Sequence, residues 1–147
     1  MEFLIIVCYF VKLLSKNSII MASNKNGYTE PAKEPTKRYC QYLSLVPDTL
    51  EEYKYWHNKE NIWKEIPEGI RKAGILNMEI YLISNHAFMI VETPLDFDWD
   101  EAFGRLATYE RQDEWENFVA RFQESGIGKR SEEKWQLMEQ IFCLTDC

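Results

Sequence analysis

A tyrosine and a histidine four residues apart, Tyr53 and His57, carry the side chains best suited to chemistry in this sequence. The residues around them predict a helix, and a spacing of four places two side chains on the same helical face. An imidazole gives and takes protons near neutral pH without a metal, and a neighbouring phenol can share its hydrogen bonds. The pair therefore predicts a catalytic site for general acid–base chemistry. The alternative is that His57 is a half-buried helix residue whose ring is capped by a neighbour.

Length and charge restrict the class of protein. The chain has 147 residues and a formal net charge of −7. This length is sufficient for one domain with a hydrophobic core. We expect no nucleic-acid partner, because nucleic-acid-binding proteins present basic patches. Aromatic residues make up 14% of the chain, which suits a packed core, a subunit interface or a sugar-binding cleft, and composition leaves all three open.

The cysteines and acidic residues do not form a metal-binding pattern. The four cysteines have no CxxC spacing, and only two histidines, His57 and His86, could join them. We therefore predict no metal site and interpret the cysteines as reduced thiols of a cytoplasmic protein. The acidic run at residues 96–100 is better explained by helix capping, because Glu101 follows Asp98 by three residues.

The first 37 residues differ in composition from the rest. Residues 3–11 form an apolar run that is too short to span a bilayer, and a glutamate precedes it where a signal peptide would be basic. Residues 22–35 are polar and read as a flexible lead-in. We expect residues 1–37 to be a flexible extension, residues 38–147 to be the domain, and the protein to have no membrane partner.

The remaining sequence predicts alternating strands and helices. A β-rich run ends at Pro47, a helical stripe then runs to Gly74 with a break near residues 58–61, and two alternating runs are joined by a turn that includes His86. We give His86 no role. Two more helices follow, then a loop at residues 125–133. The predicted strands are residues 38–46, 75–83, 87–92 and 135–144.

This order, β-α-β-β-α-α-β, is the split β-α-β pattern of an α+β ferredoxin-like sandwich, in which helices cover one face of an antiparallel sheet. The other face would expose many apolar and aromatic side chains to water. We therefore predict a homodimer formed face to face through the sheets, a dimeric α/β barrel.

From Arg38 to Leu144 the chain resembles the L-rhamnose mutarotase family, small dimeric α/β-barrel proteins that interconvert sugar anomers. The order and spacing of several motifs carry the resemblance: Pro47-Asp48, Glu51-Glu52-Tyr53-x-x-x-His57-Asn58, Ile62-Trp63, Gly74, Ile80-Tyr81 and Trp115.

The resemblance implies roles for particular residues. It places the general acid at His57 and a sugar-contacting tyrosine at Tyr53. It also implies sugar contacts at Met78, where the family has a strand tyrosine, and at Glu114 and Trp115, where the family has two adjacent tryptophans. A sub-branch linked with L-fucose resembles this chain more closely in these departures, so the identity of the sugar stays open.

We therefore expect a mutarotase that acts on L-rhamnose or L-fucose without a cofactor. His57 would donate the proton, Tyr53 would hold or relay it, Trp115 would pack against the sugar's methyl side, Met78 would line the pocket, and Glu114 would bind a hydroxyl. Glu79, Glu92 and Glu114 are the candidates for a second proton acceptor. The alternatives are a ligand-binding module or cofactorless monooxygenase of the same fold, and a purely structural dimerisation domain.

Overall fold

The computed structural model describes residues 34–125, 129 and 131–146. The first 33 residues of the predicted extension, including the apolar run, lie outside the described residues. The first strand begins at Lys37, beside the predicted start of the domain. No helix in the described part of the chain is long and apolar enough to cross a membrane.

Four antiparallel strands form one sheet in the order β2-β3-β1-β4. Their bounds are β1 Lys37–Ser44, β2 Asn77–Ile83, β3 His86–Thr93 and β4 Gln136–Leu137. The hairpin β2-β3 therefore lies to one side of β1 and the closing strand to the other, which is the strand order of the ferredoxin-like split β-α-β arrangement. The predicted α+β fold class is confirmed.

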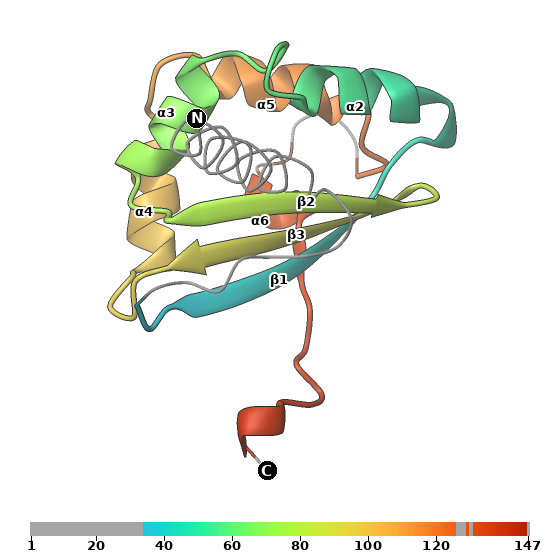
Figure 1. Ribbon diagram of the computed structural model, residues 1–147. Helices are drawn as coiled ribbons and strands as arrows, with labels where there is room; N and C mark the ends of the chain where they lie inside the picture. Colours follow the sequence, from blue (N-terminus) through green and yellow to red (C-terminus); the bar gives the residue numbers. More distant parts are fainter. Residues whose placement is uncertain (1–33, 126–128, 130, 147) are drawn as a thin grey trace, which may run out of the picture. The chain divides into compact units, whose positions relative to one another are not determined.

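The helices pack against one face of this sheet (Figure 1). A short 3₁₀ turn at Pro47–Thr49 leads into α2 (Leu50–His57), and α3 (Glu65–Lys72) follows after a break. The predicted interruption near residues 58–61 is thus confirmed, and it extends to residue 64. The remaining helices are α4 (Trp99–Leu106), α5 (Gln112–Ala120), α6 (Ser131–Lys134) and a 3₁₀ turn at Leu144–Asp146.

Two predicted helix ends are confirmed. Gly74 has a φ of 96°, a left-handed conformation that costs glycine least, and it follows the last residues of α3. Asp98 caps α4, because its side chain accepts a hydrogen bond of 2.9 Å from the backbone N–H of Glu101. In the described part of the chain, no three His, Cys, Asp or Glu residues gather as they would around a metal ion.

Two predictions about the C-terminal part of the domain were wrong. The closing strand was expected over residues 135–144, but only Gln136 and Leu137 pair with β1. Beyond them, Ile141, Phe142 and Leu144 are largely exposed, so the apolar residues that suggested a strand have no sheet to cover. A short helix, α6, also replaces the end of the predicted loop.

His86 was expected in a solvated turn, but it is the first residue of β3. Its Nδ1 lies 2.8 Å from the hydroxyl of Tyr42, which is also 2.5 Å from Oγ of Ser44. Register explains the contact, since Ser44 pairs with His86 across β1 and β3. Pairing with β1 therefore continues the strand through a residue that the sequence assigns to the turn.

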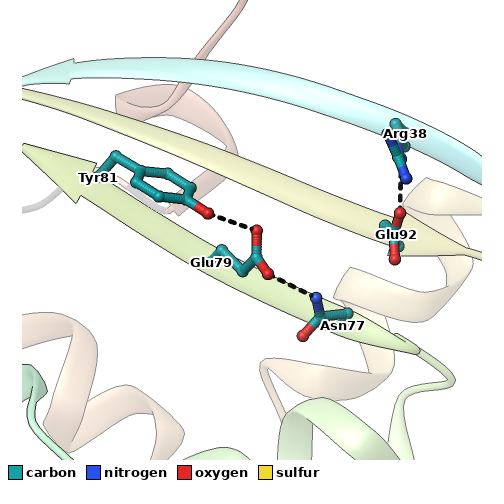
Figure 2. Close-up of polar contacts among 5 residues, drawn as sticks. All are labelled: Arg38, Asn77, Glu79, Tyr81 and Glu92. Atoms are coloured by element: carbon teal, nitrogen blue, oxygen red, sulfur yellow. Dashed lines mark hydrogen bonds and ion pairs between the residues drawn. The ribbon is translucent and has the colours of Figure 1, made fainter. Parts of the chain in front are cut away.

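The face of the sheet away from the helices carries an ordered set of polar contacts. Figure 2 shows Glu79 between Asn77 and Tyr81 along β2, bonded to both, at 3.1 Å and 2.9 Å. Arg38 of β1 reaches Glu92 of β3 at 2.5 Å. Strand alternation puts these side chains on the face opposite Met78, Ile80 and Val91.

Candidate active site

Tyr53 and His57 lie on the last turn of α2, where the sequence predicted them. The helix ends at His57 because Asn58 adopts an extended conformation and its Oδ1 accepts hydrogen bonds from the backbone N–H groups of Glu60 (2.9 Å) and Asn61 (3.0 Å). This side-chain turn competes with further helical bonding. The interruption between α2 and α3 therefore fixes His57 at a helix end beside a loop.

The two rings stack on each other. Their centroids are 3.9 Å apart and their planes differ by 29°. Nδ1 of His57 lies 2.8 Å from the backbone carbonyl oxygen of Tyr53. Because a carbonyl oxygen only accepts, Nδ1 must carry the hydrogen. In the neutral ring, Nε2 then holds the lone pair and is the nitrogen available to a ligand.

Burial sets the protonation state of both side chains. It lowers the pKa of His57 below the ordinary value of 6.5, and the hydrogen bond to the Tyr53 carbonyl opposes this effect only in part. Burial also raises the pKa of the Tyr53 phenol far above its usual range. At neutral pH the site therefore holds a neutral imidazole, which can take up a proton, and a neutral phenol, which can donate a hydrogen bond.

Two hollows meet at this pair of rings. The first, which we call the inner cavity, has a volume of about 120 Å³ and lies among the sheet, α2, α3, α4 and α5. The second, the edge cavity, has a volume of about 460 Å³ and lies between α2, α3 and the outer strand β2. The volume of the edge cavity falls within the roughly 300–1,000 Å³ common for small-molecule sites, and the inner cavity is smaller. The residues that line both hollows are Tyr53, His57, Ile62, Ile70, Met78 and Ile80.

Trp115 and Met78 also lie where a bound molecule would meet them. The Trp115 ring is 5.3 Å from the His57 ring, centroid to centroid, and lines the inner cavity. Met78 comes from β2 and lines both cavities. The structure therefore brings four of the five predicted site residues to one place.

Glu114, the fifth predicted residue, lines neither cavity. Its side chain is 63% exposed and lies 3.3 Å from Nε of Arg111, on the outer side of α5. Glu79 and Glu92, the other carboxylates named from the sequence, hold the partners seen in Figure 2 and also line neither cavity. The predicted roles of these acids stay predictions.

The sequence analysis missed a polar wall in the inner cavity. Glu116 is the one acidic residue, among those described, that lines either hollow. Its carboxylate accepts a 3.0 Å hydrogen bond from Nε2 of Gln112 and lies 3.6 Å from the ammonium group of Lys134, which is almost fully buried. The same cavity is lined by Gln41 and Gln123.

A signal for this wall exists in the sequence of α5. Gln112 and Glu116 of α5, and Gln123 just after its end, recur at helical spacing within the stripe that also holds Trp115 and Val119. Polar residues inside an apolar stripe mark a buried polar surface more than a solvated face.

Several known proteins resemble this chain in sequence. Residues 38–144 match the family model for L-rhamnose mutarotase. The chain is 36% identical to a UPF0734 protein of Dictyostelium discoideum over 114 residues, which are 74% of this chain and 90% of that protein. It is 30% identical to an L-fucose mutarotase of Xanthomonas campestris pv. campestris over 112 residues, 75% of this chain and 90% of the relative.

A solved structure has the same fold. The crystal structure of an L-rhamnose mutarotase from Formosa agariphila matches with a TM-score of 0.54 at 18% identity, over 74% of this chain and 98% of that one. The match of the family model across nearly the whole domain, together with the curated relatives, settles the classification: this chain belongs to the L-rhamnose mutarotase family.

Proposed function

We propose that this protein is a sugar mutarotase that interconverts the α and β anomers of a 6-deoxy-L-hexose, with L-fucose favoured over L-rhamnose. The observation that carries the proposal is the neutral imidazole of His57, which is tied through Nδ1, stacked on Tyr53 and set between two hollows. The preference for L-fucose rests on the similarity to the L-fucose mutarotase of Xanthomonas. It also rests on Met78 and Glu114, which stand where the L-rhamnose mutarotase family has a tyrosine and a tryptophan.

Nε2 of His57 moves the proton that mutarotation requires. It takes the proton of the anomeric hydroxyl while the bond between C1 and the ring oxygen breaks, and it gives this proton to the ring oxygen. Both oxygens are bonded to C1 in the closed sugar, so one imidazole reaches both. The aldehyde then rotates about the C1–C2 bond, and the reverse transfer closes the ring on the other face. His57 thus serves as base and as the predicted proton donor.

The other cavity residues bind and orient the sugar. The neutral phenol of Tyr53 donates a hydrogen bond that holds the anomeric end beside His57. Trp115 provides an apolar platform for the methyl side, and Met78 packs against the ring. Glu116 accepts a hydrogen bond from a hydroxyl, the role that the sequence assigned to Glu114, because its carboxylate lines the cavity. No step requires a metal or an organic cofactor.

A panel of sugars tests the proposal. Crystalline single anomers of L-fucose, L-rhamnose and D-glucose are dissolved with and without protein, and the approach to anomeric equilibrium is followed by polarimetry. We expect acceleration for L-fucose, a smaller effect for L-rhamnose and little for D-glucose. Binding of a sugar without acceleration would instead indicate a ligand-binding module, and neither effect would indicate a structural domain.

The pH dependence of the exchange follows from the protonation state of His57. Because burial lowers its pKa, the imidazole is neutral throughout the neutral range. After subtraction of the buffer rate, we expect the protein-dependent rate to stay level above pH 6.5 and to fall only at more acid pH, as the ring becomes protonated. A protein-dependent rate that rises on acidification through this range would mean that the imidazolium is the resting catalytic form.

We also propose that the protein is a homodimer joined through the open sheet face. Support comes from the apolar and aromatic side chains on that face, Tyr42, Phe88 and Ile90, and from the exposed apolar residues that follow β4. Covering such side chains is favourable because it removes apolar surface from water.

Light scattering after size-exclusion chromatography checks the dimer. We expect a mass of twice the chain's 17.6 kDa, and a monomer for Ile90→Glu, which puts a charge at the centre of the face. Lys59→Glu, a charge change in the exposed loop after α2, is the matched control and should remain dimeric. A monomeric wild-type protein at micromolar concentration would contradict the proposal.

A cytoplasmic location is part of the same proposal. It rests on the sequence, in which the cysteines are interpreted as reduced thiols, as in proteins of reducing compartments. The intact mass of the protein from its native host would reveal trimming by an export pathway and so contradict this location.

A further inference from the structure

Two glutamine side chains in the inner cavity have buried amide oxygens without a partner. Gln41 comes from β1 and Gln123 follows α5, and each is only 5% exposed. Within the described part of the protein, neither side-chain Oε1 has a hydrogen-bond partner. Both residues line the cavity that Tyr53 and His57 also line.

Such amides are unusual at these positions. Gln41 alternates with the buried Leu43 on the helix-facing side of β1 and lies opposite Met89 of β3, so an apolar side chain would suit the site. Burying an amide oxygen without a hydrogen bond is unfavourable, and nearly all buried polar groups in proteins are satisfied. A pair of unsatisfied oxygens on one cavity therefore indicates that a ligand supplies the missing donors.

The neighbouring polar groups differ in this respect. Glu116 already receives a hydrogen bond from Gln112 and lies beside Lys134. These three side chains support one another inside the protein. The unmet hydrogen-bonding capacity of the wall is thus concentrated in the amides of Gln41 and Gln123.

The chemistry of an amide fits a sugar hydroxyl. An amide group both accepts and donates hydrogen bonds, and a hydroxyl does the same. With the anomeric carbon beside His57, the amides would meet secondary hydroxyls elsewhere on the ring. L-Fucose and L-rhamnose differ in the configuration of two such hydroxyls, at C2 and C4, so groups that contact them decide which sugar fits.

We propose that Gln41 and Gln123 bind secondary hydroxyls of the sugar and thereby select between 6-deoxyhexoses. This inference rests on the proposed mutarotase function and adds the residues that set its specificity. A site built to hydrogen-bond a hydroxyl discriminates strongly against a ligand that presents none there, because its buried polar groups are left unpaired.

The test replaces each amide by an apolar side chain of similar length. Gln41→Met and Gln123→Met are compared with wild type for kcat and KM of anomer exchange with L-fucose, L-rhamnose and the 2-deoxy and 4-deoxy forms of L-fucose. Asn117→Leu, an amide replacement on the exposed side of α5, is the matched control. Thermal unfolding of each variant verifies that it is folded.

We expect kcat/KM for L-fucose to fall roughly tenfold in each methionine variant, the size of one lost hydrogen bond. The loss should fall mainly on KM, and the L-fucose to L-rhamnose ratio should move towards one. For the wild-type protein, kcat/KM should be lower by a similar factor for one of the two deoxy sugars than for L-fucose. The variant that lacks the amide facing that hydroxyl should have the same kcat/KM for this deoxy sugar and for L-fucose. Asn117→Leu should match wild type.

Two results would overturn the proposal and are distinguishable. If wild type accelerates exchange and the folded methionine variants keep its sugar ratio and its response to the deoxy sugars, the amides do not read hydroxyls, although the protein is a mutarotase. If wild type accelerates no sugar, the proposed function fails and the inference fails with it.

Discussion

Replacing His57 with glutamine is expected to lower the protein-dependent rate of anomer exchange by roughly 10²- to 10⁴-fold, the usual contribution of general acid–base catalysis. Glutamine keeps a polar side chain of similar reach but cannot take up and return a proton. Since mutarotation already proceeds in water, the observed rate should approach the buffer rate. Exchange rates from magnetisation transfer between the α and β anomeric protons measure this directly.

The second histidine provides the control. His86 lies on the opposite face of the sheet, where it contacts Tyr42, so His86→Gln should leave the exchange rate unchanged. The circular dichroism spectrum and the unfolding temperature of His57→Gln should remain close to those of wild type, because the bond from Nδ1 contributes only about 1 kcal/mol to stability. A folded His57→Gln protein with the wild-type rate would remove the imidazole from the mechanism.

Replacing Glu116 with glutamine is expected to lower kcat/KM roughly 10- to 100-fold, mainly through KM. This is the size of a hydrogen bond to a charged group, which exceeds that of a neutral one. The same change leaves the buried ammonium group of Lys134 without its carboxylate, so the unfolding temperature should also fall. Steady-state exchange kinetics and thermal unfolding separate the two effects.

A double variant tells substrate binding from structural support. Glu116→Gln combined with Lys134→Met removes both charges, and we expect it to regain stability but not kcat/KM. If activity returns with stability, Glu116 only supports the wall. Glu110→Gln, in the exposed loop before α5, is the matched acid-to-amide control. A larger loss for Glu114→Gln than for Glu116→Gln would restore the role first predicted for Glu114.

The sequence predicts the helix that carries the site better than it predicts the wall opposite. The four-residue spacing of Tyr53 and His57 determines that they share a face, and local chemistry at Asn58 ends the helix just after them. Gly74 and Asp98 are likewise predictable, because each acts on its own few residues of backbone. The two proton-handling rings are therefore a local feature of the chain.

The wall depends on tertiary packing, which a single sequence does not reveal. Whether Glu114 or Glu116 lines the cavity depends on the rotation of α5, and one residue moves a side chain by about 100° around the helix. The amides of Gln41 and Gln123, whose buried oxygens lack a hydrogen-bond partner in the described structure, come together only when β1 packs near the end of α5, where Leu45 pairs with Gln123. The short β4 is a similar case, since the apolar residues that follow it resemble a strand but pair with no strand in the described structure.

Anomer exchange by the wild-type protein, dialysed against a chelator, is the measurement that tests the central claim most directly. Magnetisation transfer between the α and β anomeric protons of L-fucose at pH 7 should show an exchange rate that grows in proportion to protein concentration. If the protein is folded and exchange of both L-fucose and L-rhamnose stays at the buffer rate, the assignment of this cavity to sugar ring opening would be contradicted.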